Sequence, residues 1–350
     1  MSGNQRSDCP PWLVAAPTLF RSYRDTIGVL DEAREALDGL SIVRKLAETV
    51  YVCGSLGRLE MHAASDVDCV VVTRAPLDAP EAAELMNSIY ATFSRLGLRT
   101  PKADGIYRSP VTRGELLDPG LRGSLNESPA VFGKRIQILL DARSVYGLSG
   151  FQRLRSDVIG WYAAGSVERN PNKSWTFLIN EVARYLHSYA SWQQFKLSRS
   201  EDDSWQLRQL KFRSSRLLTM GAMLMLLGAC DQRRDKLEWL EAQLDDTPLN
   251  RLFNLMDASH RSQYDQILMA NERIFSALAD PAVRNDLLGE GPGVTNNPES
   301  GDQAHGLDAP RSAAYLRLKS DGDLISQRMT EFMLSQQSAW GTRFFSRLLL

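Results

Sequence analysis

Residues 51–72 read YVCGSLGRLEMHAASDVDCVVV, and this stretch predicts the fold of the first half of the chain. An apolar block at residues 50–53 ends at Gly54 and Ser55, and a second apolar block covers residues 67–73. Short apolar blocks bounded by turn residues are typical of buried strands. We therefore expect two strands, joined by a turn and a short helical spacer.

Asp66 and Asp68 lie at the head of the second expected strand. Side chains at positions i and i+2 of a strand point to the same side, so these two carboxylates project together. Neighbouring carboxylates resist ionising unless a cation lies between them. Oxygen ligands on a rigid strand suit Mg²⁺ or Mn²⁺, which take few protein carboxylates and leave positions for substrate phosphates. The pair is a candidate metal site.

The turn between the strands has the composition of a phosphate-binding segment. Gly54 and Ser55 offer backbone N–H groups and a hydroxyl, and Gly57 and Arg58 follow directly. If a helix begins at this turn, its N-terminal dipole favours an anion. We expect Gly54, Ser55 and Arg58 to contact phosphate groups.

The whole arrangement resembles the nucleotidyltransferase superfamily typified by DNA polymerase β, whose signature is a strand, Gly-Ser, a helix and an Asp-x-Asp strand. The string GSLGRLEMHAASDVD is especially similar to the branch that contains the uridylyltransferase of the nitrogen-signalling PII protein. The resemblance covers about residues 45–150. It implies that Asp66 and Asp68 bind two metal ions, and that Gly54 and Ser55 hold the β- and γ-phosphates of a nucleoside triphosphate.

The superfamily usually adds a third carboxylate on a later strand. KRIQILLDA, residues 134–142, has an apolar run that we interpret as a strand ending at Asp141. The string LLDARSVYG that contains Asp141 again looks like the PII-type branch. Two alternatives stay open: Gln137 at the acidic position, or Asp104 before an expected strand at residues 105–109.

Beyond residue 150 the strand signals stop and helical periodicity continues. The predicted fold class is an α/β (α+β) nucleotidyltransferase domain with a mixed sheet, followed by an all-helical domain. The expected segments are N-terminal helices at 1–44, the catalytic domain at 45–150, a helical substrate-binding domain at 151–288, a flexible linker at 289–309 and a C-terminal helix at 310–350.

Two stretches of the helical region carry candidate site residues. Arg208, Lys211 and Ser215 share a helix face at spacings of three and four, with Arg213 and Arg216 nearby. The resemblance implies that a Lys and a Ser from such a helix reach the triphosphate, which selects Lys211 and Ser215. A second helix places Asn180, Glu181 and Arg184 within one turn, as candidates for the acceptor site. We interpret its aromatic residues, Tyr185, Tyr189 and Trp192, as core or interface.

The composition excludes several classes of protein. Lys plus Arg is 41 and Asp plus Glu is 42, and this balance argues against a chain that coats nucleic acid or anionic membrane, although a local basic patch stays possible. The four cysteines are scattered without ligand spacing, which favours buried free thiols over zinc or disulfides. The first residues lack a signal-peptide core, and the apolar run at 217–230 is too short for a membrane span. We expect a soluble, cytoplasmic protein.

The sequence thus predicts a Mg²⁺- or Mn²⁺-dependent nucleotidyltransferase that transfers a nucleoside monophosphate and releases pyrophosphate. Asp66, Asp68 and Asp141 are the expected catalytic and metal-binding residues. The acceptor stays open between a protein, an RNA end, a nucleotide and a small hydroxylated molecule. Near-zero net charge weighs against long RNA, and the PII-like strings weigh towards protein. The alternatives are a catalytically silent nucleotide-binding regulator and a helical interaction protein.

Overall fold

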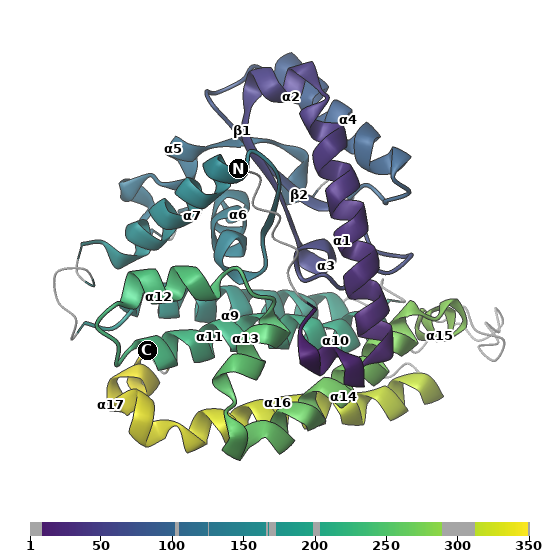
Figure 1. Ribbon diagram of the computed structural model, residues 1–350, viewed down its shortest axis with the longest axis vertical. Helices are drawn as coiled ribbons and strands as arrows, with labels where there is room; N and C mark the ends of the chain where they lie inside the picture. The colour runs from purple at the N-terminus through teal and green to yellow at the C-terminus, as the bar shows by residue number, and fades with distance from the viewer. Residues whose placement is uncertain are drawn as a thin grey trace.

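The computed structural model describes residues 9–101, 105–124, 126–165, 167, 173–198, 204–288 and 312–348. A small sheet with its covering helices forms one part of these residues, and a layer of helices packed below it forms the other (Figure 1). The linker predicted at 289–309 and the alternative carboxylate Asp104 lie outside the described residues. None of the helices in the described ranges is both long and apolar enough to cross a membrane.

The sheet has four strands in the order β3-β2-β1-β4. Strand β1 (Ala47–Cys53) pairs antiparallel with β2 (Asp68–Thr73) on one side and with β4 (Arg143–Tyr146) on the other. The short β3 (Val111–Thr112) runs parallel to β2. The predicted mixed sheet is therefore confirmed, as are the two strands read from residues 50–53 and 67–73.

Helices bury both central strands. Each apolar residue of β1 and β2 is fully buried, as the uninterrupted apolar blocks predict. Helices α1 (Pro17–Asp38) and α4 (Ala79–Arg95) lie to one side of these strands, and α6 (Pro129–Leu140) and α7 (Leu148–Ala163) lie to the other (Figure 1). Shorter elements complete this part: η1 (Pro11–Ala15), α2 (Ser41–Leu46), α3 (Gly54–Gly57), η2 (Ile106–Arg108), α5 (Arg113–Leu116) and η3 (Pro119–Leu121).

Two predicted strands are wrong. Residues 134–142 are not a strand, because α6 covers Pro129–Leu140 and Asp141 is its C-terminal cap. Every residue from Gly133 to Leu140 is buried, so this helix lacks the polar face that would show a helical period in the sequence. Residues 105–109 contain the 3₁₀ turn η2, and the strand of that region is β3, two residues further on.

The helical region surrounds α11 (Leu217–Cys230), which is buried along nearly its whole length. Helix α16 (Ala313–Ser335) packs along α14 (Arg261–Ala279) and also contacts α11, so the predicted C-terminal helix belongs to this layer. That segment is two helices, with α17 following α16. The other elements are α9 (Thr176–Ser198), α10 (Trp205–Lys211), η4 (Phe212–Arg216), α12 (Lys236–Gln243), α13 (Pro248–Leu255), η5 (Ala258–His260), α15 (Pro281–Leu287) and α17 (Gln337–Leu348).

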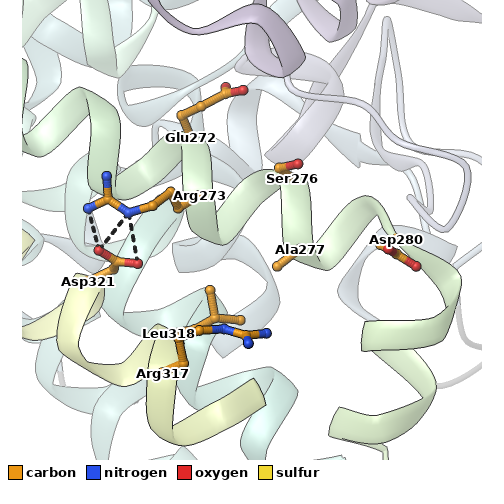
Figure 2. Close-up of a pocket in the computed structure, with 8 residues that line it drawn as sticks. All are labelled: Glu272, Arg273, Ser276, Ala277, Asp280, Arg317, Leu318 and Asp321. Atoms are coloured by element: carbon orange, nitrogen blue, oxygen red, sulfur yellow. Dashed lines mark hydrogen bonds and ion pairs between the residues drawn. The ribbon is translucent and has the colours of Figure 1, made fainter. Parts of the chain in front are cut away.

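Helix α1 joins the two parts of the molecule. It contacts β4 and α4 in the sheet part and α14 in the helical part. The backbone N–H groups of Thr18 and Leu19 donate to the two carboxylate oxygens of Glu272, at 2.8 and 3.0 Å. Figure 2 shows Glu272 on α14 pointing towards α1, beside a pocket of about 410 Å³ in which an Arg273–Asp321 ion pair joins α14 to α16. A carboxylate at a helix N-terminus is favourable because it accepts hydrogen bonds from N–H groups that lack helical partners.

Candidate functional site

One pocket lies where the sheet part meets the helical part. Every predicted catalytic or nucleotide-binding residue except Asp141 lines it, although Lys211 and Ser215 come from a segment far along the chain. The full lining is Gly54, Ser55, Arg58, Glu60, His62, Ser65, Asp66, Asp68, Lys211, Ser215, Arg216, Phe275 and Leu278.

The Gly54–Ser55 turn is built against Asp68. Cys53, the last residue of β1, pairs with Asp68, the first residue of β2, so the turn begins beside that carboxylate. Gly54 has a φ of +66°, and a Cβ added there would lie 2.6 Å from Asp68 Oδ2. Glycine alone supplies both the left-handed backbone and the space. The glycine at this position thus has a steric cause.

Asp66 and Asp68 have the alternation expected of a strand. Asp66 is exposed, and its backbone forms an isolated β-bridge with Arg99. Val67 and Cys69 are fully buried. The pKa of Asp68 is raised to about 7, chiefly by burial; Arg216 opposes this shift, while Asp66 adds to it. Close to neutral pH, the ionised form of Asp68 is therefore costly unless a cation is near.

The donor set fits Mg²⁺ or Mn²⁺. Within the described residues no cluster of three or more His, Cys, Asp or Glu side chains is arranged to hold a metal. Two carboxylates are enough for Mg²⁺, because it keeps waters and substrate phosphates in its remaining positions. Asp66 and Asp68 are the residues that would hold such an ion.

Asp141 contacts Arg58 instead of extending from a strand into the pocket. Arg58 donates from Nη1 to Asp141 Oδ2 at 2.7 Å and from Nε to Glu60 Oε2 at 2.9 Å, and all three side chains are buried. Burial raises the pKa of Glu60, and Arg58 opposes that shift. Asp141 therefore fixes Arg58 at the pocket wall, and its role as a third metal ligand stays a prediction.

Gln137, the alternative at the acidic position, faces a different group of side chains. Its Nε2 donates to Tyr107 Oη and, at 3.5 Å, to Tyr185 Oη, and it does not line the pocket. This amide therefore belongs to the packing between α6 and α9.

An irregular helical turn supplies the far wall of the pocket. Between α10 and α11, residues 212–216 form the π-helical turn η4, with non-helical angles at Ser214 (φ −113°, ψ −106°). A π-helical turn holds an extra residue, which brings positions i and i+5 closer to one face than an α-helix does. Lys211 and Arg216 are five residues apart, so the π-turn brings Arg216 towards the face that Lys211 and Ser215 share, and all three line the pocket. Single π-turns are frequent at functional sites.

Three cations and three carboxylates line the pocket, but they are not evenly paired. Arg58 is offset by Glu60 and Asp141, whereas in the described part of the chain neither Lys211 nor Arg216 forms an ion pair. Burial lowers the pKa of Lys211 to about 8; nearby Arg284 contributes, and Asp66 opposes the shift. Unpaired cations facing two carboxylates suit a ligand that brings its own anionic groups and a metal ion.

Sequence reasoning missed several residues of the pocket. Arg216 was noticed only as a neighbour of Lys211, because the π-turn that rotates it inward has no clear sequence signal. Glu60 lies two residues after Arg58 in the same motif, and this spacing of opposite charges is the sequence signal that could have placed Glu60 beside Arg58 in the pocket. Phe275 and Leu278 come from α14, and only the tertiary fold brings them here.

The candidate acceptor residues Asn180, Glu181 and Arg184 do not line the pocket. Arg184 binds Glu181 and Glu127 and lies 4.0 Å from the Phe132 ring centroid, within an ion-pair network between α6 and α9. Asn180 is exposed. The geometry gives these residues a packing role.

His62 provides a test of the pocket's electrostatics. Its pKa is lowered to about 4, first by burial and then by Lys211 and Arg284. An unfolded histidine titrates near 6.5, so between pH 6.5 and 4 the unfolded chain binds a proton that the folded chain does not, and stability falls as the pH falls. From pH 7 to pH 5 we expect the wild type to lose about 1–2 kcal/mol more unfolding free energy than His62→Asn.

Urea unfolding of both proteins at the two pH values measures this difference. Equal losses in the wild type and the variant would show that His62 titrates normally in the folded protein.

Comparison with known proteins assigns no family to the chain. No protein-family model matches the chain, and no curated protein matches it either. The argument for function therefore rests on the residues and geometry of the pocket.

Proposed function

We propose that this protein is a metal-dependent nucleotidyltransferase with the nucleotidyltransferase fold in its sheet part, and that it transfers a nucleoside monophosphate to a hydroxyl acceptor. The observation that carries the proposal is the single pocket in which Gly54, Ser55, Asp66 and Asp68 face Lys211 and Ser215. The first four residues come from one sequence motif, and the last two come from a helical segment far along the chain. Chance would rarely bring both sets to one pocket.

The reaction balances as a single displacement. The acceptor oxygen forms a bond to the α-phosphorus, the bond from that phosphorus to the bridging oxygen breaks, and pyrophosphate leaves with its electron pair. The hydroxyl proton passes to water. A bound Mg²⁺ or Mn²⁺ would lower the charge on the phosphates and favour the attacking alkoxide.

The chain's own residues position the triphosphate. Ser55 and the N–H groups of its turn would bind phosphate oxygens, and Lys211 and Arg216 would offset charge on the leaving pyrophosphate. Glu60 and Asp141 occupy Nε and Nη1 of Arg58, and neither of these bonds uses Nη2. That remaining nitrogen is a candidate donor to the same phosphates.

A label-transfer experiment tests the proposal. The full chain is incubated with each α-labelled nucleoside triphosphate and Mg²⁺ or Mn²⁺, with and without cell lysate. We expect labelled protein, nucleic acid or small molecule, with pyrophosphate released in equal amount. Absence of both products with all four nucleotides would contradict the proposal.

A second function, a catalytically silent nucleotide-binding regulator, is favoured by one observation. Arg58 already pairs with Asp141, and no three-carboxylate group is found among the residues that the structure describes. The regulator predicts tight nucleotide binding in the presence of metal without pyrophosphate release. Calorimetric titration beside the transfer assay distinguishes the two functions.

The Gly54 turn yields a matched pair of variants. A Cβ at Gly54 would strain the backbone and displace Asp68, whereas Gly97, with a φ of +77°, has nothing within 4 Å of an added Cβ. We expect Gly97→Ala to lose about 1–2 kcal/mol of unfolding free energy, because it places Ala in the left-handed region, and Gly54→Ala to lose at least as much. Only Gly54→Ala should also lower the transfer rate, because only there does the added Cβ displace Asp68. We expect a loss of at least about tenfold, which corresponds to about 1.4 kcal/mol of activation free energy.

Thermal unfolding and pyrophosphate release measured on both variants separate the two effects. Similar transfer rates in the two variants would mean that the contact between Gly54 and Asp68 is irrelevant to the reaction.

A further inference from the structure

A group of aromatic rings lies directly beside the pocket. Tyr189 of α9 stacks on Phe212 of η4, with ring centroids 5.9 Å apart and an angle of 18° between the planes. Trp192, one turn further along α9, lies 5.9 Å from Tyr189. We call Tyr189, Trp192 and Phe212 the aromatic platform. It is continuous with the pocket, because Arg216 lines the pocket and lies 5.1 Å from the Tyr189 ring centroid.

The platform extends outward to solvent. Trp192 is 47% exposed, and Phe195, a further turn along α9, is 69% exposed. By contrast, Trp175 and Trp205 of the helical region are 0% and 7% exposed. Of the two predicted roles, core or interface, the exposure of Trp192 excludes the core. A large apolar patch that stays exposed to solvent marks an interaction surface.

Positive charge borders the platform. Arg216 lies over Tyr189 on the pocket side. Lys211 is the residue before Phe212 and faces the pocket. Aromatic faces interleaved with cations are the means by which proteins bind single strands, since bases stack on the rings and phosphates meet the cations.

Tyr189, Trp192 and Phe195 form a stripe along α9, and the length of this stripe favours a nucleic-acid strand over a single nucleotide as the ligand. From Tyr189 to Phe195 is six residues of helix, about 9 Å at about 1.5 Å per residue. A single base stacked beside the triphosphate would need only the ring nearest the pocket. A stripe that continues for two turns beyond the pocket suits several successive unpaired bases.

We propose that the aromatic platform binds the unpaired bases of a single-stranded nucleic acid, and that the 3′-terminal hydroxyl of this strand is the acceptor in the pocket. The acceptor role rests on the proposed function, whereas strand binding by the platform does not. In the reaction, the 3′ oxygen bonds to the α-phosphorus and pyrophosphate leaves, so the strand grows by one nucleotide. The near-zero net charge of the chain agrees with a short contact at a strand end.

Fluorescence anisotropy of the full chain with 5′-labelled 12-nucleotide single strands, RNA and DNA of one sequence, tests the platform. The measurement is made at low salt in EDTA without nucleotide, so it does not depend on catalysis. We expect Trp192→Leu to weaken binding about 5- to 150-fold, as expected for the loss of base–aromatic stacking. A blunt duplex of the same sequence should bind more weakly than the single strands.

Phe177→Leu is the matched control, because Phe177 is 48% exposed on the same helix and does not line the pocket. It should change strand binding less than about twofold, well below a stacking contribution. Both variants replace exposed side chains by leucine, so both should keep the wild-type unfolding temperature. Thermal unfolding measures this and shows whether both variants are folded.

Two results would overturn the proposal: Trp192→Leu binding the strand as tightly as Phe177→Leu does, or the duplex binding as tightly as the single strands. Failure of the proposed function is distinct from both of these. In that case the single strand binds in a Trp192-dependent manner, but no nucleotide is added to its 3′ end.

Discussion

The double variant Asp66→Asn/Asp68→Asn is expected to release pyrophosphate at least about 10³-fold more slowly than the wild type, because both carboxylates that would hold the metal ion lose their charge. The fold should survive. Asp66 is exposed, and the raised pKa of Asp68 shows that its ionised form is disfavoured where it lies. An amide of the same shape removes that cost, so the unfolding temperature should not fall.

Glu84→Gln is the control for this variant. Glu84 is an exposed carboxylate on α4, in the same part of the molecule but away from the pocket. It should retain the wild-type rate. A double aspartate variant with the activity of Glu84→Gln would exclude these carboxylates from catalysis and, with them, the proposed mechanism.

Arg58→Met is expected to have the largest effect on stability, a loss of about 3–5 kcal/mol of unfolding free energy at pH 7. Removing the guanidinium leaves Glu60 and Asp141 as two buried carboxylates without the cation that both of them contact. Burial of an unpaired charge is far more costly than burial of the pair. Urea unfolding measures the loss.

The companion variant Arg58→Met/Glu60→Gln/Asp141→Asn separates this charge effect from lost packing. With the carboxylates replaced by neutral amides, most of the lost stability should return, because no buried charge is left unpaired. If the triple variant is as unstable as Arg58→Met, the guanidinium acts through packing alone, and the electrostatic account of this cluster is wrong.

The sequence predicted the parts of the site that local patterns determine. Gly54, Ser55, Asp66 and Asp68 belong to one strand–turn–strand motif, so their proximity follows from alternation and turn chemistry. Lys211 and Ser215 share a face at i and i+4, which an α-helical period reveals. These features need no knowledge of the tertiary fold beyond the meeting of the two segments.

The sequence did not reveal those parts of the fold and the site that depend on burial from all sides or on contacts between distant segments. Helix α6 was mistaken for a strand because its apolar residues are buried all round, so neither period dominates. Arg216 reaches the pocket through the π-turn at Ser214, which shifts the helical phase by a residue. The partner of Arg58, Asp141, is 83 residues away along the chain, and only packing brings the two together.

The hydrogen bonds from α1 to Glu272 have a consequence for the order of folding. Leu19 and Glu272 are separated by 253 residues, so α1 leaves the ribosome long before its partner on α14 is synthesised. Closing a loop of that length is entropically slow, and segments in between fold first. Helix α1 therefore completes its docking after the helical layer has formed. Because it also contacts β4, its docking adds a link between the sheet part and the helical part, beside those that α6 and α7 make with α9, α11 and α12.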